Sequence, residues 1–242
     1  MQRGLYVLIC ARDEIASRRL SHQLLEQGVH CEWARTAKAG IARLTSEEFD
    51  ALAIDLILPD QDGISLIQDI RSLGYNIPII GLSLRSSVRP ALTPLHAAVK
   101  QAGTNEAADR ARTIFAIKVA TQRVEGYHPR VLALTSDERS RRLTANTLGH
   151  CTQLVYASTL ADVKTSLEKS TFDFALADPE FFADDTTLQS FASLCPDLPV
   201  IIHTLYQIQS HSDTPPKDIA QLIRVIRTYA MLGHQAGIRA HA

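Results

Sequence analysis

The sequence lacks the long apolar runs that a membrane-spanning helix needs. No run reaches about 18 apolar residues, and the first stretch, MQRGLYVLICARDE, has no signal-peptide pattern. An excess of basic residues is also missing, because 25 Lys and Arg residues balance 26 Asp and Glu residues and leave a net charge of -1. Phosphate contacts need a basic surface, so this balance argues against direct binding of nucleic acid.

Cysteine is scarce and scattered. The four cysteines form no C-x-x-C pair and no Cys/His cluster, and the nine histidines show no H-x-x-x-H spacing, so no zinc site is expected. Free thiols are typical of a reducing compartment, which predicts a cytoplasmic protein. The G-x-G-x-x-G, Walker and G-x-S-x-G motifs are absent as well. The sequence therefore predicts that the protein is not an enzyme.

What the sequence does contain is an internal repeat. Three segments recur in the same order about 121–124 residues later: YVLICARDEIASRRL (6–20) as RVLALTSDERSRRL (130–143), FDALAID (49–55) as FDFALAD (172–178), and IPIIGLS (77–83) as LPVIIHT (198–204). This recurrence predicts two homologous domains, 1–125 and 126–242. Gly126 and Pro129 mark the boundary because they interrupt a helical pattern.

Each half alternates apolar runs with amphipathic segments. In the first half we expect strands at 5–11, 30–34, 51–56 and 77–82, and helices at 15–27, 36–44 and 64–73. Short links between alternating strands and helices predict an α/β fold with two doubly wound parallel sheets in tandem. Ligands of such sheets bind outside the carboxyl ends of the strands, where Asp13, Asp55 and Ser83 fall.

These residues resemble a known family. Asp13 after the first strand, Asp55 after the third, Pro59-Asp-x-Asp-Gly63 beyond it and Ser83 after the fourth are similar to a bacterial two-component receiver domain, which is flavodoxin-like. The resemblance covers nearly all of 4–125. It implies that Asp55 accepts a phosphoryl group, that Asp13 and Asp55 hold Mg²⁺, and that Ser83 contacts the phosphoryl group. This chemistry needs a hard cation beside the carboxylate nucleophile.

The first half departs from the family pattern in two places. The acidic pair of the family falls on Arg12 and Asp13, or on Asp13 and Glu14 if the alignment shifts by one residue. The family's lysine after a fifth strand has no clear match. Asp55 is therefore either a phosphoryl acceptor with Mg²⁺ or an inherited carboxylate without chemistry. A further hypothesis is that Arg12 reaches Asp55 and acts as an internal counter-ion in place of the metal.

The second half is a weaker copy of the receiver pattern, over about 129–230. Its matching residues are Asp137, Asp178 and Thr204, but Ser136 replaces one acid and Pro179 follows Asp178 directly. We expect a degenerate receiver that is not phosphorylated. Both receiver-like domains are thus atypical, and the second strongly so.

Function follows from the resemblance and the length of the chain. Two domains of about 120 residues use up the chain, so we expect a response-regulator-like protein without an output domain. A histidine kinase or phosphotransfer protein would phosphorylate it and so change its binding to a downstream protein. The alternative is a pseudo-receiver scaffold or dimerisation adaptor that works without phosphorylation.

Three smaller expectations concern the surface and the last helices. The apolar stripes of 107–124 and 216–230 favour packing in the core, with joining of the domains or a homodimer as the alternative. The arginine pairs at 18–19 and 141–142 are expected to be solvated. Residues 231–242 are expected to form a frayed tail.

Overall fold

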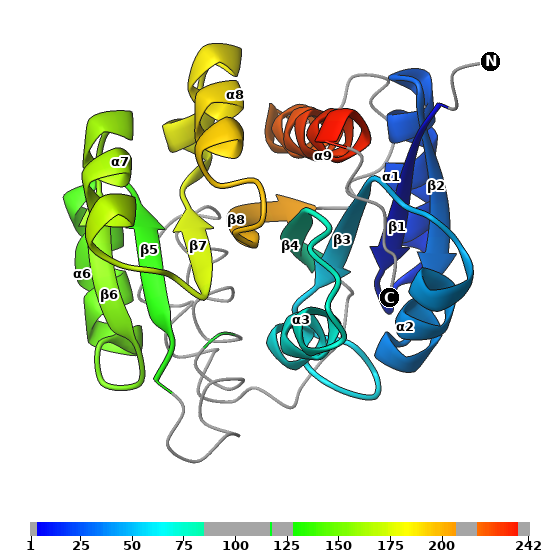
Figure 1. Ribbon diagram of the computed structural model, residues 1–242, viewed down its shortest axis with the longest axis horizontal. Coiled ribbons are helices and arrows are strands. Elements are labelled where there is room, and N and C mark those ends of the chain that lie inside the picture. Colours follow the sequence, from blue (N-terminus) through cyan, green and yellow to red (C-terminus); the bar gives the residue numbers. More distant parts are fainter. Residues whose placement is uncertain (1–3, 85–116, 118–127, 207–216, 237–242) are drawn as a thin grey trace.

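The computed structural model describes residues 4–84, 117, 128–206 and 217–236 (Figure 1). The elements of the first half are β1 (Leu5–Cys10), α1 (Glu14–Glu26), β2 (Val29–Ala34), α2 (Ala37–Ser46), β3 (Ala51–Asp55), α3 (Gly63–Ser72) and β4 (Ile79–Leu84). Those of the second half are β5 (Arg130–Leu134), α6 (Glu138–Leu148), β6 (Gln153–Ala157), α7 (Leu160–Lys169), β7 (Phe174–Ala177), the 3-10 helix η1 (Pro179–Phe182), α8 (Asp185–Leu194), β8 (Val200–Tyr206) and α9 (Lys217–Ala236).

The elements predicted for the first half are confirmed, with ends that differ by one or two residues. Thr36 Oγ1 accepts a hydrogen bond from the Ala39 N–H at 3.1 Å and so caps α2. Gly28 and Gly74 follow α1 and α3 with φ angles of 77° and 86°, a region of backbone conformation that favours glycine. Local sequence signals thus set the limits of these helices.

The eight strands among the described residues belong to one parallel sheet, in the order β2-β1-β3-β4-β8-β7-β5-β6. Each half contributes four strands in equivalent order, and the two fourth strands pair with each other, with Ile80 opposite Val200. Gly81 lies opposite Ile201, and a Cβ atom at Gly81 would lie 2.7 Å from Ile201 Cγ1. The sequence did not predict this shared sheet. The domain boundary stays a prediction, since residues 123–127 lie outside the described part.

Helix α9 is the last element of the second half but also covers the first half (Figure 1). It packs against β1, β3 and α1 as well as β8 and α8. Its buried side chains share a core cluster with residues of β1 and β3, and they are Leu222, Ile223, Val225, Ile226, Tyr229 and Ala230. Core packing of the predicted 216–230 stripe is confirmed from residue 217 on, and its contacts with both halves also agree with the alternative that this stripe joins them.

The C-terminal end of α9 is anchored rather than frayed. His234 Nδ1 lies 3.1 Å from Asp50 Oδ1, and Asp50 Oδ2 also accepts a hydrogen bond from the Tyr6 N–H at 2.7 Å. Gly233 packs against the backbone of Asp50. The prediction of a frayed tail from residue 231 is therefore wrong as far as Ala236, because contacts with the first half extend the helix.

Ile117 shows that the halves exchange contacts in both directions. It is helical and fully buried, the rest of the stripe predicted at 107–124 being outside the described residues. Its core cluster contains Leu56 and Ile64 of the first half together with residues of the second half, namely Val131, Leu148, Cys151, Phe174, Leu176 and Ile201. Each half thus places C-terminal residues in a core that the other half helps to build.

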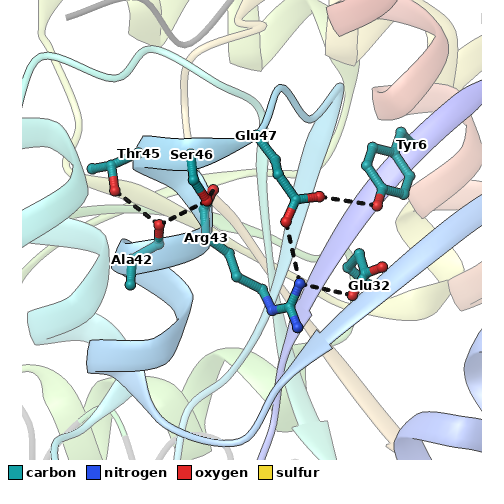
Figure 2. A network of polar contacts seen from close by, with 7 residues as sticks. All are labelled: Tyr6, Glu32, Ala42, Arg43, Thr45, Ser46 and Glu47. Atoms are coloured by element: carbon teal, nitrogen blue, oxygen red, sulfur yellow. Dashed lines mark hydrogen bonds and ion pairs between the residues drawn. The ribbon is translucent and has the colours of Figure 1, made fainter.

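A polar network ties α2 to the edge of the sheet (Figure 2). Arg43 Nη1 lies 2.9 Å from Glu32 Oε2 and 3.2 Å from Glu47 Oε1, and the Tyr6 hydroxyl donates to Glu47 Oε2 at 3.2 Å. Burial, Glu32 and Glu47 together raise the pKa of Tyr6 to about 12, so the phenol keeps its proton and remains a donor.

The two arginine pairs differ from each other. Arg18 and Arg142 are exposed, as expected, and each pairs with a glutamate one turn earlier. Arg141 is half-buried instead: its Nη2 donates to Ser158 Oγ at 2.6 Å and its guanidinium lies 5.4 Å from the centre of the Tyr156 ring. The expectation that Arg141 is solvated is wrong, because its neighbours on β6 and after it provide partners. Within the described ranges, no helix combines the length and apolar content that a membrane crossing requires.

Candidate functional site

The carboxyl ends of the parallel strands meet at one edge of the sheet. Asp55 is the last residue of β3, and Asp13 follows β1. These two strands pair directly, with Cys10 opposite Ile54. Since neighbouring strands lie about 4.8 Å apart, Asp13 and Asp55 lie in the same region of that edge. The structure brings Asp13 and Asp55 to the same edge, as the sequence predicts.

Asp55 is buried at this edge, with 2% of its surface exposed. Its Oδ1 accepts a hydrogen bond from the Ile57 N–H at 3.2 Å. Behind it, the Gly63 N–H donates to Leu56 O at 3.0 Å, and a Cβ atom at Gly63 would lie 2.6 Å from Asp55 O. Only glycine allows α3 to begin so close to the backbone of Asp55. This packing fixes the backbone that carries the carboxylate.

Asp13 has a structural role beside the candidate chemical one. It is the N-cap of α1: its Oδ1 accepts from the Ala16 N–H at 3.0 Å, and its carbonyl oxygen accepts from Ser17 Oγ at 2.7 Å. The cap uses Asp13 Oδ1 and not Oδ2. Arg12, at the family's other acidic position, is partly buried.

The two acidic residues of the loop after β3 cap helices and do not enlarge the acidic site. Asp60 accepts from the N–H groups of Ala37 and Lys38 at 2.9 and 3.0 Å, at the start of α2. Partial burial raises the pKa of Asp60, but these hydrogen bonds outweigh it and the pKa is lowered. Asp62 accepts from the Ser65 N–H at 2.9 Å and caps α3.

Ser83 and Thr204 lie inside strands and not past their ends. Strand β4 runs to Leu84 and β8 to Tyr206, because these two strands pair with each other as far as these residues. The prediction that Ser83 follows its strand is therefore wrong. The side chains of Ser83 and Thr204 lie outside the described part. So do Lys100 and Arg110, neither of which matches the family's lysine well.

In the second half, the matching carboxylate is bound by a serine. Asp178 follows β7 with 3% of its surface exposed, and the Ser140 hydroxyl donates to Asp178 Oδ1 at 3.0 Å. Asp137 caps α6 through the N–H groups of Arg139 and Ser140, at 3.2 and 3.0 Å. Sequence reasoning missed Ser140. The repeat contained a signal for it. Ser140 lies three residues after the helix cap Asp137, where the first half has the apolar Ala16 three residues after its cap Asp13.

Helix α9 fixes the segment that follows Asp178. Gln221 Nε2 donates to Pro179 O and Phe182 O, and Arg224 Nη2 donates to Phe182 O. Arg224 Nε also lies 3.3 Å from Asp185 Oδ1. Three of these contacts satisfy backbone carbonyls of η1. The loop after the second carboxylate is thus held by a helix that also covers the first half.

The donor set of the first half can accept Mg²⁺ but does not enclose it. Among the residues that the structure describes, no group of three or more His, Cys, Asp or Glu side chains is placed to hold a metal. Magnesium commonly binds through one or two carboxylates and keeps several water ligands. Asp13 and Asp55 are the two carboxylates that such a mode of binding would use here.

Comparison with known proteins covers the first half. Residues 7–102, less than half of the chain, match the model of the response regulator receiver domain. The transcriptional regulatory protein QseB of Haemophilus influenzae is 32% identical over 82 residues, 34% of this chain and 37% of QseB. PmrA of Pectobacterium parmentieri is 33% identical over 82 residues, again 34% of this chain and 37% of the relative. The chain spans little more than a third of the length of these curated relatives.

Among solved structures, the receiver domain of the Francisella response regulator 1452 is similar at 21% identity, over 59% of this chain and 93% of that chain, with a TM-score of 0.33. The sequence matches support a response regulator receiver domain at residues 7–102. The match ends at residue 102, so it does not extend to the second half.

Proposed function

We propose that Asp55 accepts a phosphoryl group from a histidine kinase or phosphotransfer protein, and that this changes the binding of a downstream protein. The observation that carries the proposal is the buried Asp55 carboxylate at the carboxyl end of β3, inside the receiver match and on the strand next to the one that Asp13 follows. Receiver domains are signalling modules, which agrees with the absence of catalytic motifs in the sequence.

The chemistry needs few groups. A carboxylate oxygen of Asp55 forms a bond to phosphorus while the bond from phosphorus to the donor's histidine nitrogen breaks, and the imidazole leaves with the bonding electron pair. Asp13 and Asp55 would hold Mg²⁺, which when bound neutralises charge between the carboxylate and the anionic donor. Gly63 and the N–H of Ile57 keep Asp55 in place.

Two exposed apolar side chains lie near this site. Ile15 in the first turn of α1 is 62% exposed, and Ile57 in the loop after β3 is 43% exposed. They flank Asp13 and Asp55 in the sequence, at the carboxyl edge of the sheet. We propose that these two side chains contact the protein that donates the phosphoryl group.

The test is phosphoryl transfer from a small phosphodonor with Mg²⁺, measured by intact mass. The wild-type chain should gain one phosphoryl group, and Asp55→Asn should gain none because the amide is not a nucleophile. Asp178→Asn is the matched control and should gain as much as wild type, since Ser140 binds the second carboxylate. Labelling of the Asp55→Asn variant, or no labelling of wild type while a known receiver is labelled, would refute the proposal.

A second candidate is a scaffold that binds partners without phosphorylation. The observation that favours it is the closed second site, where Asp178 accepts from Ser140 and α9 holds the following loop. In this case the mass would not change with a phosphodonor, and partner binding would be equal for wild type and the Asp55→Asn variant. The second half is a degenerate receiver under either proposal.

Arg12 should weaken cation binding, because it places a positive charge where the family has a carboxylate. Changing Arg12→Asp removes this charge and adds an oxygen ligand. We expect the affinity for Mg²⁺ to rise at least about tenfold, measured by isothermal titration calorimetry. Changing Arg19→Asp, on the exposed face of α1, is the control and should have a much smaller effect. Equal Mg²⁺ affinity of wild type and the Arg12→Asp variant would exclude this role for Arg12.

A further inference from the structure

The one tryptophan of the chain binds the backbone next to the candidate site. Trp33 lies on the edge strand β2, opposite Ile9 of β1. Its Nε1–H donates to the carbonyl oxygen of Ala11 at 2.7 Å. Ala11 follows β1, is fully buried, and precedes Asp13 by two residues. The side chain of Trp33 thus binds the peptide group at which the chain leaves β1 and continues to Asp13.

The segment from Ala11 to Asp13 is tied at both ends. The Ala11 N–H donates to Ala34 O at 3.0 Å, and Trp33 binds the Ala11 carbonyl. At the other end Asp13 caps α1. If the bond from Trp33 is lost, the Ala11 carbonyl is free to rotate, and the direction of Asp13 relative to Asp55 changes with it. Magnesium requires near-ideal ligand geometry, so its binding is sensitive to such a change.

The second half shows the same strand position beside a carboxylate that is bound by a serine. There Tyr156 lies opposite Ala133, as Trp33 lies opposite Ile9. Its hydroxyl donates to Arg141 O at 3.1 Å and does not bind the strand-end carbonyl. That carbonyl, of Thr135, accepts from Ser158 Oγ at 3.2 Å. The carbonyl at the end of the first strand is therefore bound by an indole N–H only in the first half, which keeps more of the acidic residues of the family.

We propose that Trp33 is a positioning residue for the cation site, holding the Ala11 carbonyl so that Asp13 faces the metal together with Asp55. The proposal rests on the proposed function of the first half. It adds a residue that acts on the metal through the backbone and touches neither phosphoryl group nor metal. Residues that orient metal ligands typically contribute about ten- to a hundredfold to affinity.

The test compares two variants of the full chain that each lose one aromatic donor. Trp33→Phe removes the bond to Ala11 O but keeps an aromatic ring, and Tyr156→Phe removes the bond to Arg141 O. Calorimetric titration with MgCl₂ should give an affinity about tenfold weaker for Trp33→Phe and unchanged for Tyr156→Phe. Urea denaturation measures the free energy of unfolding of both variants. If Trp33→Phe and Tyr156→Phe lose similar stability, a difference in their Mg²⁺ affinity reports on the site and not on general destabilisation.

Tryptophan emission provides an independent readout. In the wild-type chain it should change saturably with Mg²⁺ at the midpoint found by calorimetry, and Asp13→Asn should abolish the change. Equal Mg²⁺ affinity of wild type and Trp33→Phe, or calorimetric binding without a change in emission, would overturn the proposal. Absence of Mg²⁺ binding to wild type would overturn it as well. The mass gain at Asp55 decides the proposed function separately.

Discussion

Changing Gly233→Ala is expected to destabilise the protein by about 1–3 kcal/mol, in the range of overpacked sites. The sign is opposite to the usual one, because alanine in a helix interior is ordinarily more stable than glycine by about 0.5–1 kcal/mol. Gly233 lies in α9, where a Cβ atom would overlap the carbonyl oxygen of Asp50 and lie 3.4 Å from Pro78 Cδ. Both neighbours are backbone or ring atoms of the first half, which cannot move aside freely.

Urea denaturation followed by circular dichroism measures this change in the free energy of unfolding. Met231→Ala is the control, because Met231 lies in the same part of α9 and is 41% exposed; it should change stability by less than about 0.5 kcal/mol. If Gly233→Ala stabilises the chain, α9 does not pack on Asp50 as described. The experiment therefore tests directly whether the last helix of the second half covers the first half.

Changing Arg71→Met is expected to lower the free energy of unfolding by about 3 kcal/mol. Each hydrogen bond from a charged group contributes about 1.5–3 kcal/mol to stability, and removal of the buried charge offsets part of the loss. Arg71, in the last turn of α3, donates through Nη1 to Tyr75 O and Ile77 O at 2.7 and 2.9 Å, and through Nη2 to Asp197 O at 2.8 Å. Burial lowers the pKa of Arg71 to about 10, against the opposing charge of Asp197, so the guanidinium stays charged at neutral pH.

The bond to Asp197 joins α3 to the segment before β8 and so links the two halves. Arg71→Lys keeps the charge but cannot bind three carbonyls at once, so its loss should be intermediate. Arg130→Met is the matched control, because the guanidinium of Arg130 makes exposed bonds to Gln153 Oε1. A loss for Arg71→Met no larger than for Arg130→Met would show that this link contributes little to stability.

Much of the first half could be predicted from its sequence, because the signals are local. Apolar runs identified the strands, Thr36 capped its helix, and Gly28 and Gly74 took the backbone conformation that glycine favours. The placement of Asp13 and Asp55 at one edge followed from parallel strands alone. The use of Asp60 and Asp62 as helix caps was not predicted, since their partners are decided by how α2 and α3 approach the loop.

The sequence by itself thus determined the strands and helices of the first half, the repeat, and the edge at which Asp13 and Asp55 lie. Only the tertiary structure decided that β4 and β8 pair, that α9 covers the first half, and that Ser140 binds Asp178. The physical reason is that a strand buried on both faces is apolar whichever strand lies beside it, and backbone hydrogen bonds are the same for any neighbour. Likewise, the apolar face of a helix can pack against the sheet of either half. Such choices depend on three-dimensional fit, as Gly81 against Ile201 and Gly233 against Asp50 show.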